Sequence, residues 1–234
     1  MTPVDLASPL SLDSGNRAEL VDRAAKSIKW SFLCNAIPRL VTPFSTMILA
    51  ALLTPADFGL VAISNLVIAL AQIVIDLGFA KTVIQRRTQV AEAASTALWI
   101  SLLLSGVLYL ALWVAAPSLA LAYKNAKVVD VIRVAALALP LSSLFAIPAV
   151  LLRRNMAFRR LFWINSSSLV VSAVASVTLA VLSAGAWALI WGPLIGMTIS
   201  TGLAWRLSSW RPKFAIHWPV LRSMLGFSSW VMVA

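Results

Sequence analysis

The segment 161-LFWINSSSLVVSAVASVTLAVLSAGAWALIWGPLIGMTISTGLAW-205 contains no Asp, Glu, Lys or Arg. At ~1.5 Å of rise per residue, one helix of this length would far exceed the ~30 Å hydrocarbon core of a bilayer. The segment therefore predicts two membrane-spanning helices in succession. The small residues 183-SAGA-186 form the expected turn between them.

The composition of the whole chain agrees with this reading. Its 234 residues are 61% hydrophobic and only 12% charged, and the mean hydropathy is +0.92. Soluble domains usually contain about 25% charged residues. We therefore expect an all-α, polytopic transmembrane helical bundle. The charge-poor runs predict six spans, near residues 30–53, 57–80, 94–116, 129–151, 162–182 and 186–205.

The remaining segments divide the chain further. No compact apolar core precedes residue 28, so the N-terminus does not resemble a cleaved signal peptide. Residues 1–16 are expected to be a disordered tail. Residues 17–29 predict an amphipathic helix on the membrane surface. The six-helix bundle then occupies 30–222, and 223–234 reads as the start of a truncated seventh span.

The segment 52-LLTPADFGL-60 predicts a tight connection between the first two spans. Thr54 suits an N-cap, Pro55 suits the first helical position, and Asp57 follows at the third. Thr-x-x-Asp approximates a capping box, in which two polar side chains satisfy the first N–H groups of a helix. One helix should end near Leu53 and the next should begin near Pro55.

The net charge of +11 is distributed unevenly over the loops. Fifteen of the 19 Lys and Arg residues lie in the N-terminal segment and in the loops after spans two, four and six, whereas only Lys124 and Lys127 lie on the opposite side. The positive-inside rule then places the N-terminus in the cytoplasm. The spread over four membrane-flanking loops disfavours nucleic-acid binding and suits contact with anionic lipid headgroups.

Polar residues within the spans are the candidate cavity residues. In span one a face is formed by Asn35, Arg39, Thr42 and Thr46, and in span two a face is formed by Asn65, Gln72 and Asp76. Arg133 falls in the first turns of span four. Intramembrane charges normally face a cavity or a partner.

Two readings of these charges stay open. Arg39 can line a cavity that receives an anionic substrate, or it can pair with Asp76 and only fix helix packing. Pro38 and Pro43 flank Arg39 and should loosen the helix there. Arg133 can contact substrate or can extend its side chain to the outer headgroups.

Spans five and six carry small residues at every fourth position, which lets helices approach closely. In span five they are Ser168, Ser172, Ser176 and Ala180, and in span six they are Gly192, Gly196 and Ser200. Seven of the ten Trp residues fall near expected span ends, as in an interfacial belt, and an aromatic sugar-binding surface is the alternative reading.

Motifs for enzymatic chemistry are missing from the sequence. There is no P-loop for ATP and no metal-binding spacing of His or Cys. His217 is the only histidine and Cys34 the only cysteine, so a catalytic triad or a disulfide cannot be assembled. We expect no cofactor, no metal site and no enzymatic activity.

Five segments occur in a characteristic order: 52-LLTPADFGLVAI-63, 76-DLGFAKTVIQRR-87, 131-VIRVAALALPLSSL-144, 151-LLRRNMAFRRL-161 and 185-GAWALIWGPLIG-196. In this order they resemble the polysaccharide transporter family of the multidrug/oligosaccharidyl-lipid/polysaccharide exporter superfamily, the Wzx-type flippases. The resemblance implies two similar six-helix halves around a central cavity in the bacterial cytoplasmic membrane. It further implies that the substrate is undecaprenyl-diphosphate-linked oligosaccharide, flipped by alternating access.

Full members of that family have about twice this length, so the chain is expected to correspond to the N-terminal half and to need a second six-helix half as partner. Alone it is expected not to transport. Three other functions remain open: half of a drug exporter of the same superfamily, a membrane assembly subunit or truncated remnant without transport activity, and a membrane-embedded glycosyl- or acyltransferase. Arg39 suits the organic cations of drug exporters poorly, and no acid/base pair supports a transferase.

Overall fold

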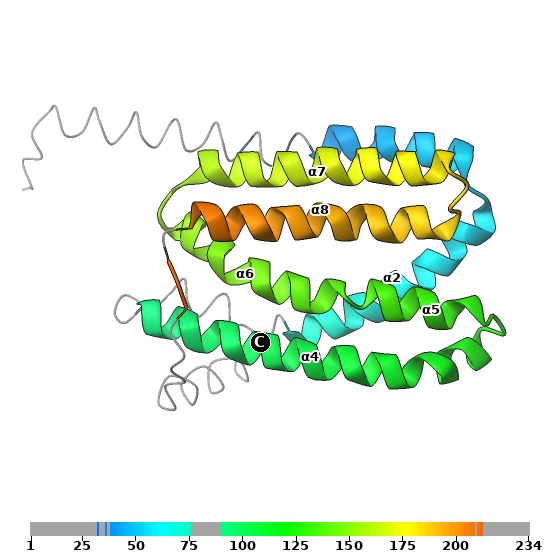
Figure 1. Cartoon of the computed structure of the whole chain (residues 1–234), viewed down its shortest axis with the longest axis horizontal. Helices are drawn as coiled ribbons and strands as arrows, with labels where there is room; N and C mark the ends of the chain where they lie inside the picture. Colours follow the sequence, from blue (N-terminus) through cyan, green and yellow to red (C-terminus); the bar gives the residue numbers. More distant parts are fainter. Residues whose placement is uncertain (1–31, 33–35, 37, 76–89, 209, 213–234) are drawn as a thin grey trace, which may run out of the picture.

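The computed structural model describes residues 32, 36, 38–75, 90–208 and 210–212. Throughout these ranges the elements are helices, which confirms the all-α prediction (Figure 1). They are a helix over Pro38–Leu52, α2 (Pro55–Ile75), α4 (Val90–Ala122), α5 (Lys127–Ala135), α6 (Ala138–Arg154), α7 (Phe158–Val181) and α8 (Ala186–Leu207).

Five helical segments are long and apolar enough to cross a membrane: Pro55–Ile75, Ala94–Ala122, Lys127–Arg154, Phe158–Val181 and Ala186–Leu207. Large apolar side chains point outward from them; Leu103 and Val114, for example, are 69% and 73% exposed. Such an outer surface suits lipid, so the chain is a multi-pass membrane protein. These segments match the second to sixth expected spans, and Pro38–Leu52 is the described part of the first.

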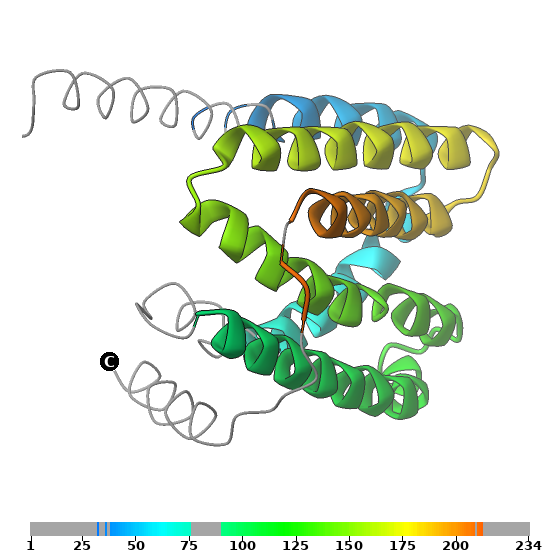
Figure 2. The same cartoon turned by 60° about the vertical axis from the view of Figure 1, so that its left-hand side comes forward.

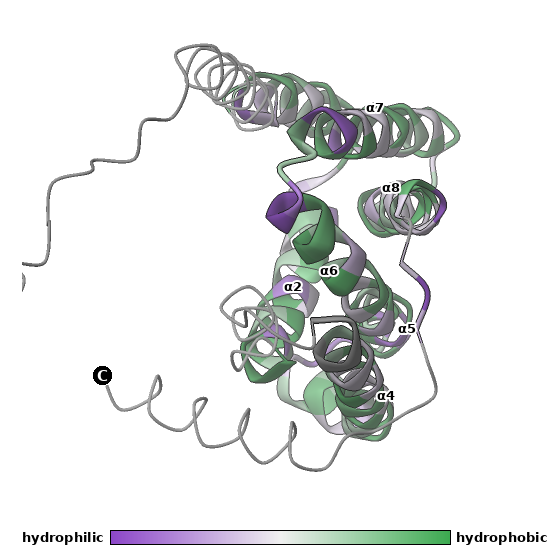
Figure 3. Ribbon diagram, turned by 90° about the vertical axis from the view of Figure 1, so that its left-hand side faces the viewer, coloured by the Kyte–Doolittle hydropathy of each residue, from purple (hydrophilic) through white to green (hydrophobic). Residues whose placement is uncertain are grey.

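The predicted tail, surface helix and seventh run, at 1–16, 17–29 and 223–234, lie outside the described residues. Within the described ranges the helices run back and forth along one direction (Figures 1 and 2). Seen end-on in Figure 3, α7 and the Pro38–Leu52 helix lie on one side, and α2, α4, α5 and α6 lie on the other. Helix α8 lies between them and contacts α2, α5, α6 and α7.

Two of the expected boundaries were wrong, and a proline accounts for the second. The third span was expected to end at residue 116, but α4 continues through Pro117 to Ala122. The fourth was expected to be one helix, but α5 and α6 are separated at Ala136–Leu137. Pro140 explains this break, because its ring has no N–H to offer the carbonyl of Ala136 and would clash with that carbonyl in a regular helix.

The turns after α4, α6 and α7 share one local geometry. Lys124, Met156 and Ser183 adopt φ values of 51°, 53° and 59°. The N–H that follows each of them bonds to a carbonyl five residues back, at 3.1 Å (Asn125 to Ala120), 2.9 Å (Ala157 to Leu152) and 3.0 Å (Ala184 to Leu179). This Schellman-type ending satisfies orphan carbonyls and reverses the chain within a few residues.

The closest helix pair is α7–α8, and its small residues explain why. A Cβ added to Gly192 would overlap Ser176 Oγ, and one added to Gly196 would lie 2.7 Å from the Ser168 carbonyl oxygen. Ser168 Oγ donates a hydrogen bond of 2.7 Å to the Gly196 carbonyl. The predicted small-residue packing is therefore confirmed at these two glycines.

One end of the bundle carries the arginines, and we call it the arginine end. Its described members are Arg153, Arg154, Arg159, Arg160, Arg206 and Arg211. Arg160 donates to the Leu207 carbonyl at 3.2 Å, and Arg211 donates to the Trp205 carbonyl at 2.9 Å. These contacts place positive charge at the C-terminus of α8, where the helix dipole favours it. Figure 3 shows hydrophilic colour there, at the α6–α7 connection and after α8.

Candidate functional site

The candidate residues of the first span lie on the outside of the chain. Arg39, Thr42 and Thr46 are exposed, and Thr46 Oγ1 donates to the Thr42 carbonyl at 2.9 Å. In α2, Asn65 is exposed as well. These side chains are thus open to whatever lies beside this chain in the membrane. Asn35 and Asp76 lie outside the described residues, so the Arg39–Asp76 pair stays a prediction.

Gln72 occupies a different position from the exposed candidates. It is half-buried on α2, and Ser142 Oγ on α6 donates a hydrogen bond of 3.1 Å to its Oε1. A polar contact between two membrane helices contributes to their association. The structure therefore gives Gln72 an interhelical hydrogen bond, and its role in a cavity stays a prediction.

Arg133 on α5 lies against an aromatic ring. Its guanidinium carbon is 4.0 Å from the ring centroid of Trp113 on α4, which is a cation–π contact. Its Nε is buried and has no hydrogen-bond partner among the described residues. Arg133 thus packs against Trp113, a residue that is itself 45% exposed.

The end opposite the arginines contains the starts of α2, α5 and α8, and we call it the Asp57 end. The Asp57 carboxylate accepts hydrogen bonds from the Thr54 hydroxyl at 2.6 Å and from the Thr54 N–H at 3.1 Å. Asp57 N–H donates in return to Thr54 Oγ1 at 3.3 Å. The capping box predicted from Thr-x-x-Asp is confirmed.

The same carboxylate also caps a second helix. Asp57 Oδ1 accepts a hydrogen bond of 3.0 Å from the N–H of Ala186, the first residue of α8. Gly185 permits this approach, since its φ of 56° and ψ of −134° suit only glycine and an added Cβ would lie 3.1 Å from Asp57 Oδ1. One acidic side chain therefore joins the starts of α2 and α8.

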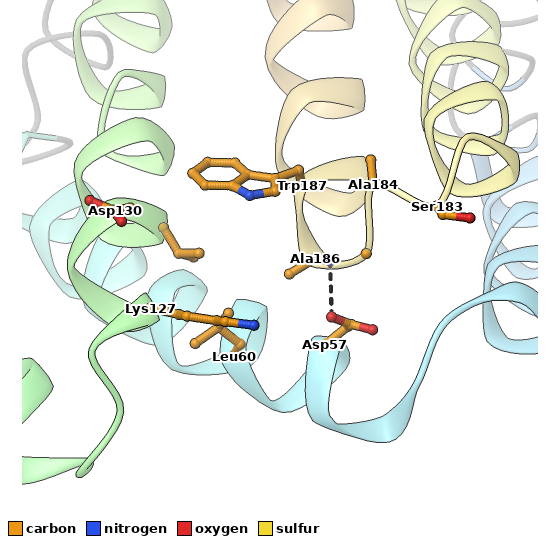
Figure 4. A pocket seen from close by; sticks show the side chains of 10 residues that line it. Asp57, Leu60, Lys127, Asp130, Ser183, Ala184, Ala186 and Trp187 are labelled. Atoms are coloured by element: carbon orange, nitrogen blue, oxygen red, sulfur yellow. Dashed lines mark hydrogen bonds between the residues drawn. The ribbon is translucent and has the colours of Figure 1, made fainter.

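A pocket of about 430 Å³ opens beside this junction (Figure 4). Its walls come from α2, α5, α8 and the α7–α8 turn, and its lining residues are Asp57, Leu60, Lys127, Asp130, Val131, Ser183, Ala184, Gly185, Ala186 and Trp187. In Figure 4 the Trp187 indole extends from α8 toward α5, and the Lys127 side chain extends across Leu60 toward Asp57. Sequence reasoning did not find this pocket, because its residues come from three separate parts of the chain.

Metal ligands are not grouped in the described part of the chain. No set of three or more His, Cys, Asp or Glu side chains there is placed to hold a metal ion.

Comparison with known proteins identifies the family. A family model described as "Polysaccharide biosynthesis protein" matches residues 48–234. The succinoglycan biosynthesis transport protein ExoT of Rhizobium meliloti (strain 1021) is 24% identical over 207 residues, which are 88% of this chain and 42% of that protein. No solved structure matches the chain. The chain spans less than half of the length of this relative, and it belongs to the polysaccharide biosynthesis and transport family that its motifs predicted.

Proposed function

We propose that this chain forms one half of a flippase that moves undecaprenyl-diphosphate-linked oligosaccharide across the bacterial cytoplasmic membrane by alternating access. Membership in the family and the similarity to a protein named as a succinoglycan transport protein support a role in polysaccharide export. The single observation that supports a lipid-linked diphosphate as the substrate is Arg39, a charged side chain exposed on an apolar helix.

An exposed arginine in such a helix requires a partner. Neighbouring exposed side chains include Phe44 and Met47, which are 69% and 74% exposed and suit lipid or a protein surface. A guanidinium left alone in hydrocarbon is costly, whereas its planar fork binds phosphate oxygens in a bidentate manner. A lipid-linked diphosphate supplies such oxygens, so Arg39 is proposed to contact it.

The proposal needs a second six-helix bundle, either as the rest of a longer protein or as another copy of this chain. Thr42, Thr46 and Asn65 are exposed together with Arg39, and a second bundle would cover them. The relative has more than twice the matched length, which is the length that two such halves require. The substrate would then cross in a cavity between the halves.

The orientation is part of the proposal. Lys and Arg residues favour the cytoplasmic side of a bacterial inner membrane, so the arginine end is proposed to face the cytoplasm and contact anionic lipids there. The N-terminus would lie on the same side. The transport step moves substrate without making or breaking covalent bonds, so no catalytic residue is assigned.

The test uses cells that lack their own flippase and express the complete transporter with single substitutions in this half. Arg39→Ala should abolish surface polysaccharide, and Arg39→Lys should restore only part of it, because an ammonium keeps the charge and loses the fork. Arg153→Ala, which removes an exposed charge at the arginine end, is the matched control. Membrane levels of each variant are measured by immunoblot.

Normal export by Arg39→Ala would contradict the cavity role. If instead exchanging Arg39 and Asp76 restores the export that each single change removes, the internal ion pair is the correct account.

A further inference from the structure

We propose that the pocket at the Asp57 end is a binding subsite for one uncharged sugar residue of the exported glycan. This inference rests on the proposed function, because it assigns a second contact to the same class of substrate. The volume of about 430 Å³ falls within the ~300–1,000 Å³ of typical small-molecule sites.

The charges of the lining disfavour an anionic ligand. Asp57 and Asp130 are acidic and Lys127 is basic, so the wall carries one net negative charge. The net negative charge opposes anions, whereas a cation would be attracted by the two carboxylates and repelled by Lys127.

The N-termini of α5 and α8 do not make the pocket a site for anions. The Ala186 N–H is bonded to Asp57, and the Val128 N–H is bonded to the Asn125 carbonyl at 3.1 Å. The backbone donors that a phosphate would use at a helix N-terminus are thus already engaged.

A sugar ring suits the hydrogen-bonding groups and the aromatic face of the pocket lining. Each hydroxyl both donates and accepts, so it can accept from Lys127 Nζ and donate to a carboxylate oxygen. Within the described residues neither Lys127 Nζ nor Trp187 Nε1 donates a hydrogen bond, so both donors can bond a ligand; the Lys127 charge also acts on the Asp57 carboxylate. The half-buried Trp187 offers an apolar face on which the C–H face of a sugar can pack.

The position of the pocket suits a subsite on the path of the glycan. The starts of α5 and α8 lie at the same end of the bundle (Figure 1), and the pocket lies there beside the Asp57–Ala186 junction (Figure 4). In the proposed orientation this is the side on which the glycan is released. A sugar bound here would be held against α5 and α8 after crossing.

The experiment measures binding directly and does not depend on transport. The full chain is reconstituted in nanodiscs and titrated with cellotetraose and maltotetraose, two neutral glucose oligosaccharides, by saturation-transfer NMR. Trp187→Ala and Lys127→Ala should each weaken binding by about tenfold or more, a loss of at least about 1.4 kcal/mol. Circular dichroism and gel filtration establish that each variant is folded. Because the Lys127 side chain is exposed, replacing it with alanine does not disturb the core.

Two substitutions serve as matched controls. Trp191→Ala removes an exposed indole one turn further along α8, and Lys124→Ala removes a lysine just before α5; neither residue lines the pocket. Both should leave the affinity within about twofold.

Three results would overturn the inference: no binding of either oligosaccharide by the unmodified chain, equal binding by all four variants, or a dependence on Trp187 and Lys127 seen only with glycerophosphoethanolamine. The last result would assign the pocket to a zwitterionic lipid headgroup. If the complete transporter still depends on Arg39 for export, each of these results removes the subsite and leaves the proposed function intact.

Discussion

Asp57 and Ala186 are separated by 129 residues in sequence and joined by one hydrogen bond of 3.0 Å between the carboxylate and a backbone N–H. The bond ties the start of α2 to the start of α8, and the Thr54 capping box holds the carboxylate in place. Two helix starts thus depend on one side chain, so we expect substitution of Asp57 to lower the stability of the bundle.

Asp57→Ala should lower stability by about 2 kcal/mol, because two helix caps of about 1 kcal/mol each are lost. Asp57→Asn should cost less, since its amide oxygen still accepts one bond. Thermal unfolding in detergent measures the effect. The control is Asp130→Ala, which removes an exposed acid of the same pocket and caps no helix in the described structure. An equal loss in both alanine variants would contradict the capping role.

Gly192→Ala and Gly196→Ala should each destabilise the α7–α8 pair by about 1–3 kcal/mol, because a methyl group has no room against α7. Gly202→Ala on the same helix is the control, since nothing lies within 4 Å of the added carbon. There the change should be neutral or stabilising, as alanine favours helix by up to about 1 kcal/mol. The unfolding midpoints of the three variants are compared; similar losses in all three would show that helix propensity, and not close packing, governs the effect.

Arg133 and Trp113 should show a coupling energy of about 0.5–2 kcal/mol in a double-mutant cycle, as expected for a cation–π pair at 4.0 Å. Arg133→Met and Trp113→Leu are suitable changes because both keep an apolar side chain. Unfolding free energies of the four proteins give the coupling. A coupling near zero would indicate that Arg133 is held by another contact. If Arg133→Met lowers export and leaves the unfolding free energy unchanged, a contact between Arg133 and substrate is favoured.

Topology can be tested with single cysteines on a Cys34→Ser background, since Cys34 is the only native cysteine. In the proposed orientation Ser183→Cys should react with a membrane-impermeant maleimide added to intact cells. Asn155→Cys, next to the arginines, should react only after the membrane is permeabilised. Labelling of the second position from outside would invert the orientation and place the sugar pocket on the cytoplasmic side.

Local sequence patterns predicted the features whose causes are local. The Thr54–Asp57 capping box, the spacing of Gly192 and Gly196, and the turn at residues 183–186 each follow from neighbouring residues. The break before α6 could have been predicted from Pro140, since a proline disturbs the helix four residues earlier. The passage of α4 through Pro117 could not, because no local signal marks it; Ala116 and Ala120, on either side of the proline, pack in a core with residues of α2, α5 and α8.

The pocket could not be predicted from the sequence, because its residues meet only through the packing of the helices. Lys127, Trp187 and Asp57 are distant in the chain, and no periodicity relates them. Their convergence depends on the order in which the helices pack, with α8 between α7 and the remaining helices. Arg39 and Thr42, chosen from a helical face, are exposed in the structure, and their role in a cavity stays a prediction because it depends on what lies beside the chain.

The close pairing of α7 and α8 also bears on how the bundle assembles. The two helices are consecutive, and only the short turn between Val181 and Ala186 must close before their glycines and serines meet. Closing so short a loop costs little entropy, so this hairpin can form as soon as both helices have entered the bilayer. The bond between Asp57 and Ala186 must wait for α8, which is made last among the described helices. We therefore expect the ribosome to have completed nearly the whole described chain before the start of α2 acquires its final contacts.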